Sequence, residues 1–352
     1  MDVFTSVTLN YLPKARILAQ TLKQFHPNWT FHLLICERSD VLTREADPII
    51  IEKDLFDRVV WLNEMDIPDL STWVFKHTVV ELCTAVEGYY LHSLAQQGVE
   101  KILYIDPDIA VFNNLDQLDT LLADNGILLI PHLVDYTDDP HSIENNEIAG
   151  TLRHGVFNFG FLGVNVKRKD GARFIEWWWK RLYDYCYADY DRGLFTDQKW
   201  GDLIPSFFAD YFIIRDPGYD VASWNLDCRQ ISFNSAGQML INGQHPLRFY
   251  HFTGYDSGAG MSVIDYLTTG GNNAVVRELW DWYNYKLNAN GHAELVRHPC
   301  SYDYFDNGKK ILKEMRLLYR NRLDLQQRFT DPFTTSAGDS YYNWYIENVS
   351  RK

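Results

Sequence analysis

The chain has 352 residues, 46% hydrophobic and 23% charged, which is the composition of a globular protein with one large core or two smaller ones. Its net charge is -14 at pH 7, and no cluster of Lys and Arg suited to a nucleic-acid groove is evident. We therefore expect no nucleic-acid partner.

Five cysteines are scattered without a C-x-x-C pair, which favours a thiol-reducing compartment. The first residues enter a strand-like run without a basic and apolar leader, and no apolar stretch of about 18 residues is present. These features predict a cytoplasmic protein, with a peripheral contact at the inner face of the membrane left open.

The first 36 residues have a βαβ pattern. Residues 3–9 and 31–36 form apolar runs typical of buried strands, and Pro13 begins an amphipathic helix between them. A dinucleotide fingerprint of the G-x-G-x-x-G type is absent from the first turn. The turn instead carries residues that suit either nucleotide binding or ordinary capping and packing, namely Thr8, Asn10 and Tyr11.

A helix predicted over 71–97 leads into the most informative segment, the apolar run 101–112 with Asp106 and Asp108. Two carboxylates at the carboxyl end of a buried strand suit a divalent cation that carries phosphates. Asp-Pro-Asp is also good turn chemistry, and phosphatases of the haloacid dehalogenase type use Asp-x-Asp after a strand with the first Asp as nucleophile. On this segment alone, the three interpretations stay open.

A helix over 115–123 and a strand over 126–131 continue the alternation, which predicts a mainly parallel sheet covered by helices. The acidic segment 135–150 is predicted to pass over the site as a lid. A helix over about 170–187 carries Trp177–Trp179, which we assign to core packing rather than to a sugar platform.

From about residue 272 the pattern becomes helical and basic. Two interpretations stay open for this part. One is a basic face that binds an anionic acceptor or a membrane surface, and the other is a helix that packs through an apolar stripe. We divide the chain into a catalytic domain, 1–270, and a mainly helical extension, 271–352. The basic residues are Lys309, Lys310, Lys313, Arg316, Arg320 and Arg322.

Five motifs follow one another along the chain, namely Asp106-x-Asp108, Phe157-Asn158-x-Gly160, Thr196-Asp197-Gln198, Trp224-Asn225 and His251-x-x-Gly254. In this order they resemble the metal-dependent, retaining glycosyltransferases of the GT-A fold, especially family 8 and related bacterial enzymes of surface-glycan synthesis. The resemblance covers roughly residues 3–256 and implies a Rossmann-like, mainly parallel sheet. It also implies a hexosyltransferase that moves a sugar from a nucleotide sugar, with UDP as the best guess, to a glycan, lipid-linked or protein acceptor.

The resemblance also assigns roles. Asp106, Asp108 and His251 would hold Mn²⁺ or Mg²⁺, and Asp197 and Gln198 would be catalytic. The amide oxygen of Gln198 would steady an oxocarbenium-like transition state, and whether it attacks covalently or only stabilises stays open. The donor-binding set is Thr8, Asn10, Tyr11, Lys76, Asp106, Asn158, Trp224, Asn225 and Gly254.

Purely structural interpretations stand beside these roles. His251 would be a core histidine, Asp197 an N-cap and Asn158 part of a strand-end turn. A noncatalytic sugar- or nucleotide-binding protein would not need the Asp-Gln and His-x-x-Gly motifs together. A haloacid dehalogenase phosphatase would need a second acidic pair, which is not apparent.

One departure from the family concerns the diphosphate. The family commonly has a lysine three residues after the Gly of His-x-x-Gly, whereas this chain continues Gly254-Tyr-Asp-Ser-Gly258. Lys76, Arg248 or the backbone N–H groups near Gly258 and Gly260 are the candidate replacements.

Overall fold

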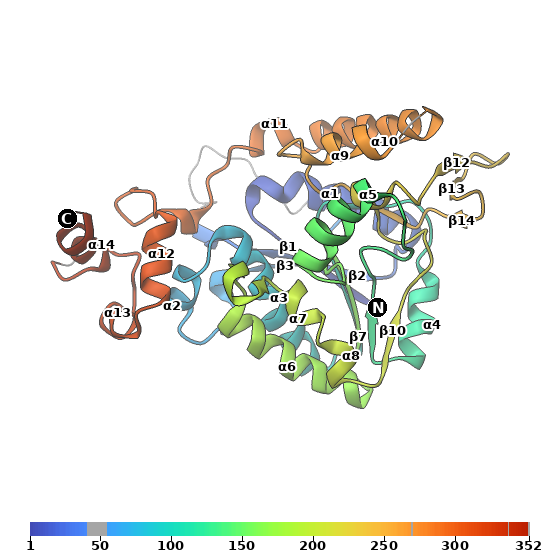
Figure 1. Ribbon diagram of the computed structural model, residues 1–352. Helices are drawn as coiled ribbons and strands as arrows, with labels where there is room; N and C mark the ends of the chain where they lie inside the picture. Colours follow the sequence, from blue (N-terminus) through green and yellow to red (C-terminus); the bar gives the residue numbers. More distant parts are fainter. Residues whose placement is uncertain (41–54, 269, 337, 351–352) are drawn as a thin grey trace.

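The computed structural model describes residues 1–40, 55–268, 270–336 and 338–350 (Figure 1). Residues 41–54 and 269 of the predicted catalytic domain, and 337 and 351–352 of the predicted extension, lie outside this description. At the centre is a seven-stranded sheet in the order β10-β6-β7-β4-β1-β2-β3. Its strands pair in parallel except for β7, which is antiparallel to both β4 and β6.

The central strands are almost continuously apolar because helices cover both faces of the sheet. They are β1 (Asp2–Val7), β2 (Thr30–Ile35), β3 (Arg58–Trp61), β4 (Lys101–Ile105), β6 (Ile127–Leu129), β7 (Phe161–Asn165) and β10 (Tyr211–Ile213). The prediction of an α/β protein with a mainly parallel, helix-covered sheet is confirmed.

Two helices lie on each face. On one face, α1 (Leu12–Phe25) and α4 (Asp116–Asp124) bury Leu18, Leu22 and Leu118 with Leu103 of the sheet. On the other face, α3 (Val79–Gln96) and α6 (Lys169–Tyr185) bury Val86 and Trp178 with Phe4 and Tyr104. Trp178 is 1% exposed, so its assignment to the core is confirmed.

The prediction of one helix over 71–97 is wrong, because α2 (Leu70–Phe75) ends before α3 begins at Val79. Thr78 caps α3 in a capping box, in which the side chain of Glu81 accepts from the backbone N–H of Thr78 at 2.8 Å. The interruption turns α2 toward the C-terminal helices, as seen on the left of Figure 1.

A small second sheet, β11-β15-β5, stands beside the carboxyl end of β4. Its strands are β5 (Ile109–Val111), β11 (Val221–Ala222) and β15 (Phe249–His251). The other strands are β8 (Ala188–Asp189), β9 (Leu194–Phe195), β12 (Ile231–Phe233), β13 (Met239–Ile241) and β14 (His245–Pro246). Three further short helices are α5 (Pro140–Ser142), α7 (Gln198–Gly201) and α8 (Ile204–Phe207).

The C-terminal part is mainly helical, and the predicted C-terminal helices are present (Figure 1). The division into domains at 270/271 stays a prediction. The helices are α9 (Ala259–Leu267), α10 (Gly270–Ala289), α11 (His292–Leu295), α12 (Lys313–Arg320), α13 (Leu323–Arg328) and α14 (Tyr341–Tyr345).

The basic face predicted for this part is wrong at two of its arginines. Arg316 is 3% exposed and donates to the carbonyl oxygens of Phe75 and Tyr302 at 3.2 and 2.5 Å. Arg320 pairs with Glu81 at 2.6 Å. The apolar stripe of α12 docks on the α2 end and carries these two side chains inward, whereas Lys313 remains exposed. Among the described residues, no helix is long and apolar enough to cross a bilayer.

Candidate active site

The site begins where β4 ends. Asp106 and Asp108 lie in the turn between β4 and β5, and the backbone N–H of Asp106 donates to the carbonyl oxygen of Gly160 at 2.8 Å. The antiparallel pairing of β4 with β7 places Ile105 opposite Phe161, which brings the 158–160 turn beside the aspartates. The turn interpretation of Asp-Pro-Asp is therefore correct as geometry, and it leaves both carboxylates in a crevice.

The register of the second sheet brings His251 to the same place. His251 stands opposite Ile109 in the antiparallel pair of β15 and β5, and beside Ala222 in the parallel pair with β11. The backbone N–H of Phe252 donates to the carbonyl oxygen of Asp108 at 2.8 Å. Residues far apart in sequence thus meet at one edge of the sheets.

The three predicted metal ligands form a compact group. The Nε2 atom of His251 lies 3.0 Å from Oδ1 of Asp108 and 3.5 Å from Oδ2 of Asp106, and one ligand atom from each residue lies within 4.8 Å of the others. In an octahedron with ligands at about 2.1 Å, neighbouring donors are about 3 Å apart. Two carboxylates and one imidazole therefore fit a Mn²⁺ or Mg²⁺ ion, with positions left for further oxygens.

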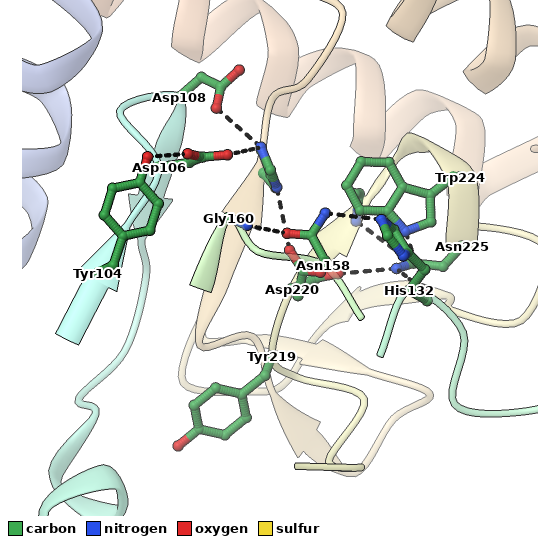
Figure 2. A network of polar contacts seen from close by, with 12 residues as sticks. Tyr104, Asp106, Asp108, His132, Asn158, Gly160, Tyr219, Asp220, Trp224 and Asn225 are labelled. Atoms are coloured by element: carbon green, nitrogen blue, oxygen red, sulfur yellow. Dashed lines mark hydrogen bonds and ion pairs between the residues drawn. The ribbon is translucent and has the colours of Figure 1, made fainter. Parts of the chain in front are cut away.

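Packing at Gly160 supports the same fit. A Cβ atom there would lie 2.6 Å from Oδ1 of Asn158, 2.6 Å from Cε1 of His251 and 2.9 Å from Oδ2 of Asp106. Only a residue without a side chain leaves room for these groups to converge (Figure 2).

Burial and neighbouring charges shift the pKa values of the two aspartates in opposite directions. Burial raises the pKa of Asp106 to about 6, although the charge of His251 opposes the shift. Burial also disfavours ionisation of Asp108, but the charge and hydrogen bond of His251 outweigh it and lower the pKa of Asp108 to about 2. Burial disfavours the imidazolium of His251 as well, while Asp108 and Asp220 raise its pKa well above the usual value. Without a metal, these neighbours favour the protonated form of His251, and a bound cation would replace the proton on Nε2.

Two cavities meet at this group, and both are lined by Asp106 and Asp108. The first, of about 360 Å³, lies along the end of β1 and the start of α3 and includes the predicted residues Thr8, Asn10 and Tyr11. The second, of about 350 Å³, holds His251 and Gln198 and is reached by the predicted residues Asn158 and Trp224. The structure thus gathers most of the predicted site around one point.

Gln198 and Asp197 stand at the start of α7. Gln198 lines the second cavity, and its amide nitrogen donates to the carbonyl oxygen of His154 at 3.4 Å. Asp197 occupies the N-cap position of this helix, as the structural interpretation expected, but its side chain makes no capping hydrogen bond. Burial, with the charge of Asp106 adding, raises the pKa of Asp197 to about 7, and the side chain is therefore able to donate as well as accept a hydrogen bond near neutral pH.

Asn158 forms the predicted strand-end turn and also lines the second cavity, while its donor-binding role stays a prediction. Its side-chain oxygen accepts from the backbone N–H of Gly160 at 2.8 Å, as a strand-end turn requires. Its amide nitrogen lies 3.2 Å from Nε2 of His132, a second histidine on the cavity wall. Trp224 donates to the carbonyl oxygen of His132 at 3.2 Å and meets the ring of His251 edge to face.

The structure does not bring three predicted donor-binding residues to the cavities. Lys76 ends α2, and its ammonium lies 5.7 Å from the ring centroid of Tyr183, outside both cavity linings. Asn225 is fully buried in the turn that follows β11, and its side chain bonds to the backbone of Ala222 and Asp220. Gly254 serves a turn with a φ of 72°, where a Cβ would lie 2.7 Å from the nitrogen of Gly260.

Sequence reasoning missed one cation beside the site. The ammonium of Lys14 lies 4.0 Å from the ring centroid of Tyr11 and 2.7 Å from Oδ2 of Asp256. Burial raises the pKa of Asp108, and the charge of Lys14 adds to the larger influence of His251 that lowers it. Arg248, another candidate replacement for the missing lysine, instead donates to the carbonyl oxygen of Asn114 at 2.8 Å. The only sequence signal for Lys14 was its position just after the 8–11 turn.

The acidic segment lies at the site, as predicted. Within and just after it, α5 is followed by a π-helix over Ile143–Leu152. Asn145, Asn146, Gly150 and Thr151 line the second cavity. Movement of this segment as a lid stays a prediction.

Fold and site together define an α/β protein with a crevice suited to a divalent cation and flanked by two cavities. No family model matches the chain. A curated relative, the uncharacterized protein YfnF of Bacillus subtilis strain 168, is 28% identical over 186 residues, which is 50% of this chain and 57% of the relative.

Three glycosyltransferases are among the solved structures that resemble the chain. The galactosyltransferase LgtC, in complex with donor and acceptor sugar analogs, has 18% identity and a TM-score of 0.43, over 77% of this chain and 97% of that one. GlyE of Streptococcus pneumoniae TIGR4 has 16% identity and a TM-score of 0.42, over 86% and 66%. Mouse xyloside xylosyltransferase 1 has 16% identity and a TM-score of 0.40, over 72% and 98%.

Proposed function

We propose that the protein is a metal-dependent glycosyltransferase that moves a sugar from a nucleotide sugar, with UDP as the expected nucleotide, to a glycan, lipid-linked or protein acceptor. The observation that carries the proposal is the meeting of two cavities at Asp106, Asp108 and His251. A nucleotide sugar has the matching form, because its diphosphate lies between a nucleoside and a sugar.

In this proposal the first cavity takes the nucleoside. Asn10 offers amide hydrogen bonds, and Tyr11 offers a ring and a hydroxyl, to a base or ribose. A divalent cation held by Asp106, Asp108 and His251 would neutralise charge on the leaving diphosphate. Lys14 is our candidate for the additional positive charge, because it lies under Tyr11 and its partner Asp256 follows Gly254.

The second cavity then takes the transferred sugar and the attacking hydroxyl of the acceptor. Asp197 and Asn158 are assigned to hydrogen bonds with sugar hydroxyls, and Gln198 to the anomeric carbon. Fixed amide oxygens and carboxylates of this kind stabilise positive charge that develops in the transition state. We expect the product to keep the α configuration of the donor.

The test is hydrolysis of a panel of nucleotide sugars by the metal-free protein with and without added Mn²⁺. We expect turnover of at least one UDP-sugar that depends on Mn²⁺ and stops with excess chelator. Asp108→Asn should abolish this turnover while circular dichroism shows an intact fold, because it removes a charged ligand and creates no cavity. The free energy of unfolding should fall, because the variant also loses the ion pair with His251.

Three outcomes would contradict parts of the proposal. Binding of nucleotide sugars without any turnover or transfer would favour a noncatalytic binding protein. Full turnover of the Asp108→Asn variant in chelator would exclude the metal role. A β-linked product from an α-linked donor, read by proton NMR of the new linkage, would exclude retention.

A further inference from the structure

A third acidic side chain, Asp220, lies on the far side of His251 from Asp106 and Asp108. The Oδ1 atom of Asp220 lies 3.4 Å from Nδ1 of His251, and the residue is fully buried. Apart from this contact with His251, neither of its carboxylate oxygens has a hydrogen-bond partner in the described part of the chain. The two nitrogens of the imidazole therefore face different carboxylates (Figure 2). Nε2 faces Asp106 and Asp108, and Nδ1 faces Asp220.

The backbone around Asp220 is held in a conformation that an aspartate rarely adopts. Its φ is 53°, in the left-handed region. Its carbonyl oxygen accepts from Nδ2 of Asn225 and from Nη1 of Arg229, each at 2.9 Å, and Nη1 of Arg229 also donates to the carbonyl oxygen of Tyr219 at 2.7 Å. These contacts fix the turn that directs the carboxylate at His251.

We propose that Asp220 is a positioning residue for the metal site, an inference that rests on the proposed function. The carboxylate accepts the proton on Nδ1 of His251, which orients the ring and leaves the lone pair of Nε2 directed at the position between the two aspartates. Carboxylates that accept the second N–H of a metal-binding histidine raise its basicity and commonly strengthen metal binding by 10–100-fold.

The position of Asp220 separates this role from that of a ligand. Only Asp106, Asp108 and His251 form the group whose donor atoms converge within 4.8 Å among the described residues. Asp220 therefore acts through His251 and not by contact with the cation. Asn225 contributes to the same arrangement. Its side chain bonds to the backbone of Ala222 and Asp220 and so holds the turn from which the Asp220 carboxylate projects.

The experiment is a titration of the metal-free, full-length protein with Mn²⁺, followed by the electron paramagnetic resonance signal of the free ion. It compares the wild type with Asp220→Asn, His251→Ala and the double variant. Asp216→Asn is the matched control, because Asp216 lies in the same loop and pairs with another histidine, His245, at 3.3 Å.

We expect Asp220→Asn to weaken Mn²⁺ binding by roughly 10–100-fold and the Asp216→Asn control to bind like the wild type. In the His251→Ala background, Asp220→Asn should have no further effect, because its influence passes through the missing imidazole. Nitrogen-15 NMR of the Mg²⁺-loaded wild type should show the proton of His251 on Nδ1.

The results that overturn the inference are distinct from those that overturn the function. Absence of Mn²⁺ binding by the wild type would remove the metal site and this inference together. Binding by the wild type, weakened by His251→Ala but unchanged by Asp220→Asn, would refute the role of Asp220 alone. An equal loss from Asp220→Asn in both backgrounds would also refute it, since the effect would not pass through His251.

A second variant guards against a folding defect in Asp220→Asn. Asp220→Gly removes the carboxylate and places at this position the residue that best tolerates a left-handed backbone. It should weaken Mn²⁺ binding in the same way while circular dichroism shows an intact fold. Wild-type affinity in a folded Asp220→Gly variant would again refute the proposal.

Discussion

Gly160→Ala tests how tightly the metal group is packed. Gly160 lies next to β7 and its backbone is not in the left-handed region, so alanine adds no backbone strain there. The added methyl group would lie 2.6 Å from both Asn158 and His251, and 2.9 Å from Asp106. Ordinary carbon contacts begin near 3.5 Å, so these groups would have to retreat by roughly 1 Å.

The expected cost is larger for function than for stability. Overpacking of this kind lowers the free energy of unfolding by about 1–3 kcal/mol. Displacement of reacting groups by 1 Å lowers turnover by about 100-fold. We therefore expect a folded protein with weakened Mn²⁺ binding and about 1% of the wild-type Mn²⁺-dependent turnover of UDP-sugar.

The assay combines Mn²⁺ titration, donor hydrolysis and urea unfolding. Gly338→Ala is the control, because a Cβ at Gly338 would meet no heavy atom within 4 Å. Wild-type Mn²⁺ affinity and turnover in Gly160→Ala would refute the close convergence of Asp106, Asn158 and His251. Equal losses in the control would show that the effect is not local.

Three further predictions concern charges near and far from the site. Lys14→Met should weaken binding of UDP in the presence of Mn²⁺ by roughly tenfold or more in calorimetry, because charge-assisted contacts contribute about 1.5–3 kcal/mol. The control Lys23→Met, near the other end of α1 and paired with Asp57, should leave the affinity for UDP unchanged. Arg320→Met should lower the free energy of unfolding in urea by about 3–5 kcal/mol, because it leaves the buried carboxylate of Glu81 without its positive partner. The control Lys313→Met, at an exposed position of the same helix, should change the free energy of unfolding by no more than about 0.5 kcal/mol. Burial lowers the pKa of His77 well below its usual value, so the stability that neutral His77 contributes is present above pH 6.5 and is lost as the pH falls, by up to about 1.4 kcal/mol per unit. Unfolding curves at pH 7, 6 and 5 should therefore converge between wild type and His77→Gln, and a constant difference would contradict this assignment.

The sequence predicted those parts of the fold in which a short pattern decides the structure. The buried strand before Asp106 was predictable because a short apolar run rich in isoleucine and ended by Asp-Pro is typical of a strand in a covered sheet. The break at Lys76–Thr78 was missed although its signal was present, since Thr78 and Glu81 have the spacing of a capping box. The apolar stripes on either side of this break masked it.

The burial of Arg316 and the position of Asp220 could not be predicted from the sequence, because both depend on tertiary contacts. Arg316 appeared as part of a basic face, yet its position next to Met315 on α12 carries it into the interior when the stripe docks. Asp220 belongs to none of the five motifs. The pairing of β11 with β15 brings it next to Nδ1 of His251. Pair contacts across strands determine such positions, and a single sequence does not record them.

The register of β15 against β5 has a consequence for how the site is assembled. Side chains alternate along a strand, so a slip of one residue would turn His251 away and direct the buried ring of Tyr250 or Phe252 toward the aspartates. A chain emerging from the ribosome carries both aspartates long before it carries His251. The complete set of three ligands therefore forms only after β15 has found its partner, and uptake of a cation by all three marks a late event in the maturation of the protein.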